Sequence, residues 1–184
     1  MRRAILIGKK LLTMSRKEKK SAIRIETRSS AETQEMAKML AETIAATSRR
    51  RAVVVGLQGE LGAGKTTFAQ GFARALGVTE RVLSPTFVLM KIYPLKKGSF
   101  RRLVHIDCYR ITSPKDITPL GLTEILKDPE TIVLIEWPER MRKTIPRDAL
   151  WLEFFHGAQP RERRITMEGF SKALRSGLTR PHAL

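Results

Sequence analysis

The sequence predicts a single α/β domain with a mostly parallel central sheet flanked by helices. Residues 52–57 form an apolar, β-branched run typical of a strand that is buried on both faces. A glycine-rich segment at residues 59–67 follows directly, and then Phe68 and Phe72 recur at helical spacing. A second apolar run at residues 131–136 supplies another interior strand. Strand, glycine loop and helix in this order favour the α/β class.

The elements before the glycine-rich segment are predicted from local patterns. Residues 22–27 alternate apolar and charged side chains, which indicates a half-exposed strand. Ser29 and Glu32 form a capping box that opens a helix, with an apolar stripe on its buried face. The arginines at 49–51 are expected to end this helix, because cations suit its negative terminus.

The elements after the glycine-rich segment follow in short succession. Residues 88–93 and 103–107 are predicted strands, joined by a hairpin turn at 96–99. Beyond them we expect a short helix at 122–126 and two late strands at 150–155 and 164–167. The whole array fits one domain of the phosphate-loop type.

Charge and length suggest three segments. The chain has 184 residues and a formal net charge of +17. We expect a basic, disordered N-terminal extension at residues 1–21, the folded domain at 22–170 and a basic tail at 171–184. Met14 is an alternative start that would shorten the extension. Such an excess of cations favours RNA or an acidic protein face, or else serves general solubility.

The single cysteine, Cys108, excludes an intrachain disulfide and suits a reducing compartment. An apolar stretch near the N-terminus is interrupted by Lys9 and Lys10, so it is too short for a signal sequence. We therefore expect a cytoplasmic protein without a membrane partner.

Residues 59–67 carry the phosphate-binding pattern G-x-x-x-x-G-K-[ST]. Its glycines allow backbone N–H groups to approach phosphate oxygens, next to the positive end of the following helix. Lys65 is expected to bind the β- and γ-phosphates, and the Thr66 hydroxyl is a candidate ligand for Mg²⁺. We assign nucleotide binding to the whole loop, namely Gly59, Leu61, Gly62, Ala63, Gly64, Lys65, Thr66 and Thr67.

Candidate catalytic residues lie where strands end. Glu136 closes an apolar strand and is the natural acidic partner for Mg²⁺. Asp107 closes another strand and is a candidate to hold a metal-bound water or to polarise the nucleophile, with a structural role as the alternative. Thr86 either meets the γ-phosphate or Mg²⁺ in a switch-like loop or is a plain turn residue. Trp137 either stacks on a base or packs against the core.

Four segments in order resemble the TsaE family of bacterial ATPases, also called YjeE. They are Gly-Glu-Leu-Gly-Ala-Gly-Lys-Thr-Thr (59–67), Ser-Pro-Thr-Phe (84–87), His-Ile-Asp-Cys-Tyr-Arg (105–110) and Ile-Glu-Trp-Pro-Glu (135–139). The likeness spans residue 22 to about residue 168. It implies an ATP-hydrolysing accessory of the machinery that installs threonylcarbamoyl on the adenosine beside the tRNA anticodon. Its partners would be homologues of TsaB and TsaD, docked as a heterodimer, with tRNA reached through that complex.

The resemblance also implies residue roles. Lys65 would hold the β- and γ-phosphates of ATP, while Thr66 and Glu136 would coordinate Mg²⁺. Thr86 would belong to a switch-like loop, and Asp107 would serve the hydrolytic step. Further residues implied near the nucleotide are Trp137, Ser30, Thr33 and Arg161.

Three other functions remain open at this stage. A small-molecule or nucleoside kinase would share the loop and use Asp107 as a base, although no lid segment is evident. A GTPase is disfavoured, because the chain contains no asparagine for the usual guanine-selecting motif. An RNA-binding protein driven by charge would bind regardless of Lys65. For the ATPase we expect slow intrinsic turnover, since no arginine finger is apparent.

Overall fold

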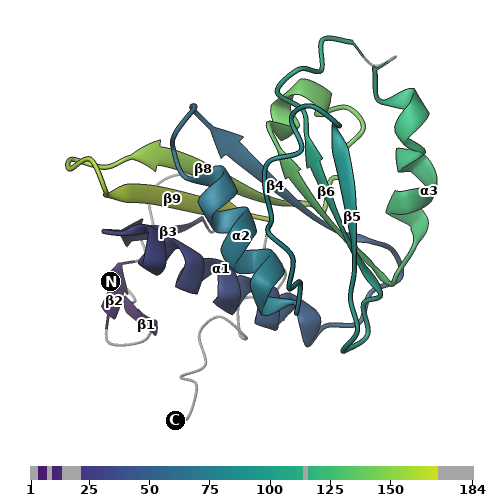
Figure 1. The fold of residues 1–184 in the computed structure, drawn as a ribbon. Coiled ribbons are helices and arrows are strands. Elements are labelled where there is room, and N and C mark those ends of the chain that lie inside the picture. Colours follow the sequence, from purple (N-terminus) through teal and green to yellow (C-terminus); the bar gives the residue numbers. More distant parts are fainter. Residues whose placement is uncertain (1–3, 8–9, 14–21, 114–115, 170–184) are drawn as a thin grey trace.

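A seven-stranded sheet with the order β3-β9-β8-β4-β7-β6-β5 forms the centre of the computed structural model (Figure 1). The structure describes residues 4–7, 10–13, 22–113 and 116–169. The strands are β3 (Ile23–Thr27), β4 (Val53–Gly59), β5 (Met90–Pro94), β6 (Arg102–Asp107), β7 (Thr131–Glu136), β8 (Leu150–His156) and β9 (Arg163–Glu168). The α-helices are α1 (Ser30–Ala45), α2 (Lys65–Ala75) and α3 (Leu122–Lys127).

The parallel strands occupy the middle of the sheet. Strands β8, β4, β7 and β6 are mutually parallel, whereas β3, β9 and β5 pair antiparallel with their neighbours. The predicted mixed fold with a parallel core is therefore confirmed, with antiparallel strands added at both edges. At these edges, short connections join β5 to β6 and β8 to β9, and a short connection permits only antiparallel pairing.

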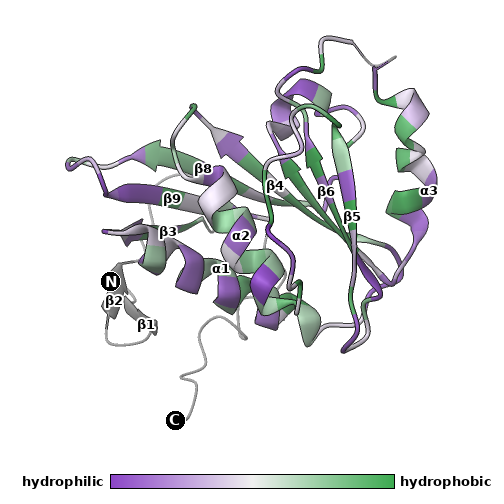
Figure 2. Cartoon of the chain, in the orientation of Figure 1, coloured by the Kyte–Doolittle hydropathy of each residue, from purple (hydrophilic) through white to green (hydrophobic). Residues whose placement is uncertain are grey.

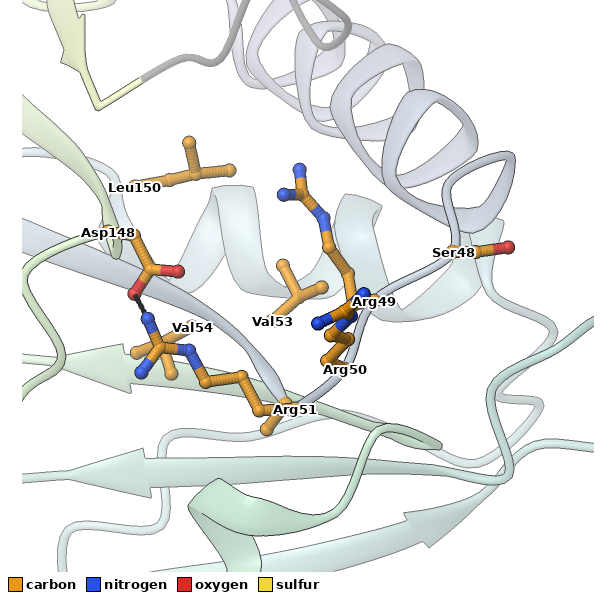
Figure 3. Close-up of a pocket in the computed structure, with 9 residues that line it drawn as sticks. Ser48, Arg49, Arg50, Arg51, Val53, Val54, Asp148 and Leu150 are labelled. Atoms are coloured by element: carbon orange, nitrogen blue, oxygen red, sulfur yellow. Dashed lines mark ion pairs between the residues drawn. The ribbon is translucent and has the colours of Figure 1, made fainter.

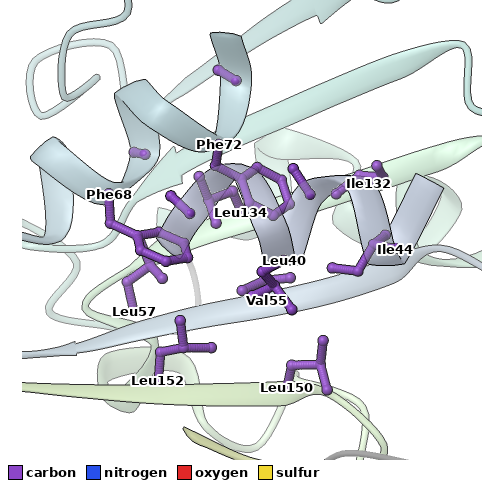
Figure 4. Packing of buried hydrophobic residues seen from close by; sticks show 14 of the residues in the cluster. Leu40, Ile44, Val55, Leu57, Phe68, Phe72, Ile132, Leu134, Leu150 and Leu152 are labelled. Carbon is purple, nitrogen blue, oxygen red and sulfur yellow. The ribbon is translucent and has the colours of Figure 1, made fainter. Parts of the chain in front are cut away.

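Both faces of the central strands are covered, and this explains their continuous apolar sequences. Val55 and Leu57 of β4 pack into one cluster with α1 and α2, which Figure 4 shows from close by. Val54 points the other way and joins Leu122 and Ile125 of α3 in a second cluster. Figure 2 accordingly shows hydrophobic colours in the central strands and hydrophilic colours on the outer turns of α1.

Helix α1 begins as predicted but ends earlier than expected. The Glu32 N–H donates to Ser29 Oγ at 3.1 Å, while the Glu32 carboxylate accepts from the Arg28 N–H at 2.9 Å. The helix stops at Ala45, and its last turn contains no basic residue. The expectation that the arginines at 49–51 end the helix is wrong. Thr47 ends it instead, because its N–H and its hydroxyl both donate to Ile44 O, at 2.9 and 2.8 Å.

Helices α1 and α2 pack together because α2 carries a glycine at their contact. A Cβ atom at Gly71 would lie only 2.6 Å from both Cα and the carbonyl oxygen of Gln34. Backbone atoms cannot retreat as a flexible side chain can, so the contact requires glycine. This approach fixes the start of α2, and with it the glycine-rich loop, against the sheet.

The N-terminal extension, for which we expected disorder, contains two short strands. Strands β1 (Ala4–Ile7) and β2 (Lys10–Thr13) pair antiparallel in a separate sheet. The β-branched residues Ile5, Ile7 and Thr13 favour extended backbone despite the surrounding charge. Residues 14–21, which include Met14, and the tail at 171–184 lie outside the described residues. Within the described ranges, every helix falls short of the length and apolar character needed to cross a membrane.

Cys108 lies directly after β6 and is fully buried. Its thiol donates to Met141 Sδ across 3.1 Å. Burial, together with the negative charges of Asp107 and Glu139, raises the pKa of this thiol to about 12. Cys108 is therefore a neutral core residue at ordinary pH.

Candidate nucleotide-binding site

A cavity of about 320 Å³ opens at the carboxyl ends of β4, β6 and β7. This edge of a parallel sheet is where ligands of α/β proteins bind. The cavity brings together ten residues that the sequence predicted, namely Leu61, Gly62, Gly64, Lys65, Thr66, Thr67, Thr86, Asp107, Glu136 and Trp137.

The glycine-rich loop connects β4 to α2 through backbone conformations that other residues resist. Gly64 is the N-cap of α2 with φ 101°, and no side chain caps the first N–H groups of the helix. Gly59 lies beside β8, where a Cβ atom would meet Phe154 O at 2.4 Å. Ala63 is fully buried and, like Gly59, supports the loop from outside the cavity lining. Free N–H groups at a helix start suit an anionic ligand.

Lys65 is held across the floor of this cavity. Its ammonium donates to the carbonyl oxygens of Gly59 and Glu60, both at 2.7 Å. It also lies 4.0 Å from the centre of the Trp137 ring, a cation–π distance. Burial lowers the pKa of Lys65, although the negative charges of Glu136, Glu139 and Asp107 oppose that shift. The Lys65 ammonium is thus held near the loop by hydrogen bonds that it can exchange for bonds to a ligand.

Thr66 and Glu136 meet on one wall of the cavity. The Thr66 hydroxyl donates to Glu136 Oε2 at 3.0 Å, with Oε1 at 3.3 Å. On its other side, the carboxylate lies 3.0 Å from Nε2 of the buried His105, which fixes its orientation. A hydroxyl and a carboxylate are hard oxygen ligands of the kind that Mg²⁺ prefers. The residues present therefore fit the ion expected from the sequence.

Asp107 ties the loop around Ser84 and Thr86 to the sheet. Its Oδ2 atom accepts from the Thr86 hydroxyl at 2.6 Å and from the Ser84 hydroxyl, while Oδ1 accepts from the Tyr109 N–H at 2.8 Å. Asp107 is also the direct neighbour of Glu136, because the two pair in register on parallel strands β6 and β7. The two carboxylates consequently share one edge of the sheet, as their positions at strand ends predicted.

Three residues that the resemblance placed near the nucleotide lie away from the cavity lining. Ser30 and Arg161 are exposed. Thr33 is buried, where its hydroxyl lies 2.8 Å from that of Thr27. The basic residue that reaches the loop is Arg163, whose Nη2 atom donates to Gly62 O at 3.1 Å.

Sequence reasoning assigned no role to His105, Ser84 or Tyr109, although all three contact the site carboxylates or line the cavity. A signal was present for the histidine. His105 precedes Asp107 by two residues in a strand, so both side chains face the same way. Ser84 and Tyr109 lie in loops, where spacing predicts no direction.

Known proteins are similar to this sequence over more than half of its length. The model of a family described as threonylcarbamoyl adenosine biosynthesis protein TsaE matches residues 27–165. The chain belongs to the TsaE family. The matched range contains every residue of the cavity, and the resemblance drawn from the four sequence segments is confirmed.

Several TsaE relatives are similar to this chain at moderate identity. The tRNA threonylcarbamoyladenosine biosynthesis protein TsaE of Bacillus subtilis is 37% identical over 113 residues, which cover 61% of this chain and 67% of the relative. The TsaE protein of Nostoc is 42% identical over 106 residues, covering 56% of this chain and 60% of the relative. That of Borreliella burgdorferi is 37% identical over 95 residues, covering 52% and 66%. The aligned regions thus span about two thirds of these TsaE relatives or less.

A solved structure supports the fold. The crystal structure of Bacillus subtilis YdiB superposes with a TM-score of 0.67 and 30% sequence identity. The superposition covers 86% of this chain and 94% of that one. The TsaE chain described here therefore shares the YdiB architecture over nearly its whole folded part.

Proposed function

We propose that this TsaE-family protein is a magnesium-dependent ATPase that serves threonylcarbamoyladenosine formation in tRNA. The observation that carries the proposal is the 3.0 Å contact between the Thr66 hydroxyl and the Glu136 carboxylate, beside the glycine-rich loop. That contact joins two expected metal ligands from segments 70 residues apart in the chain. Family membership supports the role in tRNA modification.

The chain would bind the triphosphate by exchanging internal hydrogen bonds for bonds to phosphate. Lys65 would transfer its ammonium from the carbonyls of Gly59 and Glu60 to the β- and γ-phosphate oxygens. The uncapped N–H groups at the start of α2 would face the same phosphates. Trp137, already beside the lysine, would flank the nucleotide.

Hydrolysis requires metal binding and an oriented water molecule. Thr66 and Glu136 would hold Mg²⁺, which when bound neutralises charge on the phosphates. Asp107, on the neighbouring strand, would orient the attacking water through its carboxylate. Its Oδ2 atom now accepts from Ser84 and Thr86, so movement of their loop toward the γ-phosphate would free that oxygen.

Turnover by the isolated chain should be slow. Among the described residues, the cavity lining contains Lys65 but not a single arginine. An arginine contributed by a partner is a common way to complete such a site. We propose that homologues of TsaB and TsaD, as a heterodimer, dock on this protein and that ATP hydrolysis sustains repeated catalytic cycles on tRNA.

Glu136→Gln tests the catalytic assignment. The amide keeps the shape but loses the negative charge, so Mg²⁺-dependent phosphate release should fall by about two orders of magnitude. Nucleotide affinity should remain within about tenfold, because Lys65 and the loop are unchanged. The measurement is phosphate release from ATP under a magnesium titration. Glu35→Ala, an exposed change on α1, is the control. Unaltered hydrolysis in Glu136→Gln would contradict the metal role.

The same assay separates the ATPase from a kinase. Phosphate released to water supports the proposal, whereas phosphate retained on a nucleoside would identify a kinase.

The partner proposal is tested by mixing the pure protein with the TsaB and TsaD homologues of its own source. Co-elution, with ATP turnover faster than that of the isolated chain, supports docking. Separate elution with unchanged turnover argues against it.

A further inference from the structure

A second cavity, of about 460 Å³, lies at the opposite end of the sheet from the nucleotide site. Its wall is the segment from Ser48 to Val54, which leads from α1 into the amino end of β4, and Asp148 and Leu150 complete it (Figure 3). The glycine-rich loop leaves the carboxyl end of the same strand. Seven residues of strand separate the two sites by about 20 Å. This cavity therefore takes no part in ATP binding.

The charges around this cavity are unbalanced. Arg51 pairs with Asp148 across 2.8 Å, and that aspartate is the only acidic residue among the described residues of the lining. Arg49 and Arg50 have no carboxylate partner among the described residues. Among the described residues, the Arg49 Nε atom is buried and has no hydrogen-bond partner. A buried guanidinium N–H without an acceptor is costly, so an anion that accepts from it would stabilise it.

The simplest alternative is that the arginines compensate the negative end of α1. That helix ends at Ala45, and its last turn contains no basic residue. Two of its last carbonyls have local donors, since Ala46 N–H donates to Glu42 O and Thr47 donates twice to Ile44 O. Within the described part of the chain, none of the hydrogen bonds to helix carbonyls comes from Arg49, Arg50 or Arg51. Arg49 and Arg50 are therefore available to an external anion, whereas Arg51 is already paired with Asp148.

We propose that this arginine cavity, defined by Arg49, Arg50 and Arg51, binds the phosphate groups of an RNA backbone. Guanidinium groups match phosphate oxygens in a two-pronged geometry. Arg50 is exposed beside the half-buried Arg49, so these two neighbouring side chains can contact phosphates of one strand, while Arg51 would have to exchange Asp148 for a phosphate. The formal charge of +17 favours a polyanion over a single small anion.

The cavity offers no aromatic platform, so binding should depend on the backbone and not on base identity. Its lining contains arginines, aliphatic residues, Ser48 and Asp148 but no Phe, Tyr or Trp. The RNA proposal does not depend on ATP hydrolysis and would survive failure of the proposed function. Its site also differs from any docking surface near the nucleotide cavity.

The experiment measures binding of the full chain to a labelled single-stranded oligoribonucleotide of mixed sequence over a salt series. Arg49→Ala/Arg50→Ala should weaken binding about tenfold or more at physiological salt. It should also lower the slope of log affinity against log salt by about 1.4, since each single-strand phosphate contact contributes about 0.7. Arg28→Ala/Lys38→Ala removes the same charge before the start and in the middle of α1, and is the matched control.

The outcomes distinguish RNA binding at the arginine cavity from general electrostatic attraction to the chain. Loss of binding in the arginine variant alone supports the proposal, as does retention of RNA binding by Lys65→Ala. Equal weakening in both double variants would reduce the effect to general charge and overturn it. Inorganic phosphate that binds the arginine cavity, with RNA affinity unaltered by the arginine changes, would also overturn it. Arg50→Ala alone, on an exposed side chain, repeats the test without disturbing the fold.

Discussion

Replacing Lys65 by alanine is expected to weaken ATP binding by about a hundredfold or more. The ammonium is the only cation that lines the described nucleotide cavity. Each charge-assisted hydrogen bond to phosphate contributes about 1.5–3 kcal/mol, and two such bonds would be lost. The carbonyls of Gly59 and Glu60 would lose their donor as well, which loosens the loop. Affinity and turnover should therefore fall together.

Isothermal titration with ATP and Mg²⁺ measures this loss. Lys127→Ala is the matched control, because its side chain is exposed at the end of α3 and, among the described residues, pairs only with Glu124. The control should bind as the unaltered chain does. ATP binding of equal strength by Lys65→Ala and the unaltered chain would remove the basis of the nucleotide assignment.

The substitution Gly71→Ala is expected to destabilise the protein, against the usual trend for helices. Alanine inside a helix normally gains about 1 kcal/mol over glycine. Here the new Cβ atom would lie 2.6 Å from both Cα and the carbonyl oxygen of Gln34. Overpacking against backbone costs about 1–3 kcal/mol and forces α1 and α2 apart. After the helix-propensity gain is subtracted, the net loss should be about 1 kcal/mol, with weaker ATP binding because α2 begins at the phosphate loop.

Urea unfolding followed by circular dichroism gives the change in the free energy of unfolding. The sign of this change distinguishes the two effects, since packing predicts a loss of stability and helix propensity predicts a gain. A more stable Gly71→Ala variant would show that the two helices have room to separate without cost. Gly71→Val should be more harmful still, because it adds two methyl groups at the same contact.

The parts of the site that follow from the sequence are those fixed by short-range rules. The glycines, Lys65 and Thr66 lie within one loop, so their spacing along the chain is enough to predict that they are close in space. Glu136 and Asp107 are brought together because the carboxyl ends of parallel strands share one edge. Local pattern and strand direction were sufficient for these residues.

The rest depends on pairings that spacing does not reveal. Arg163 reaches Gly62 because β9 returns antiparallel beside β8, which itself lies next to β4. The sequence does not reveal this strand order, so Arg161, two residues earlier, was an equally reasonable prediction. Thr33 lies outside the cavity lining because its hydroxyl turns inward to Thr27 at the end of β3. The hairpin turn at 96–99 predicted the antiparallel pairing of β5 with β6, whereas the antiparallel pairing of β9 with β8 and β3 was not predicted.

The deep position of Cys108 has a practical consequence. It is the sole cysteine of the chain, and its neutral, inaccessible sulfur should resist alkylation in the native protein. A thiol engineered elsewhere would then be the one site open to a maleimide dye. Phe87→Cys would place such a fluorophore on an exposed position next to Thr86. Its emission would follow the opening and closing of that loop in real time as the triphosphate arrives and leaves.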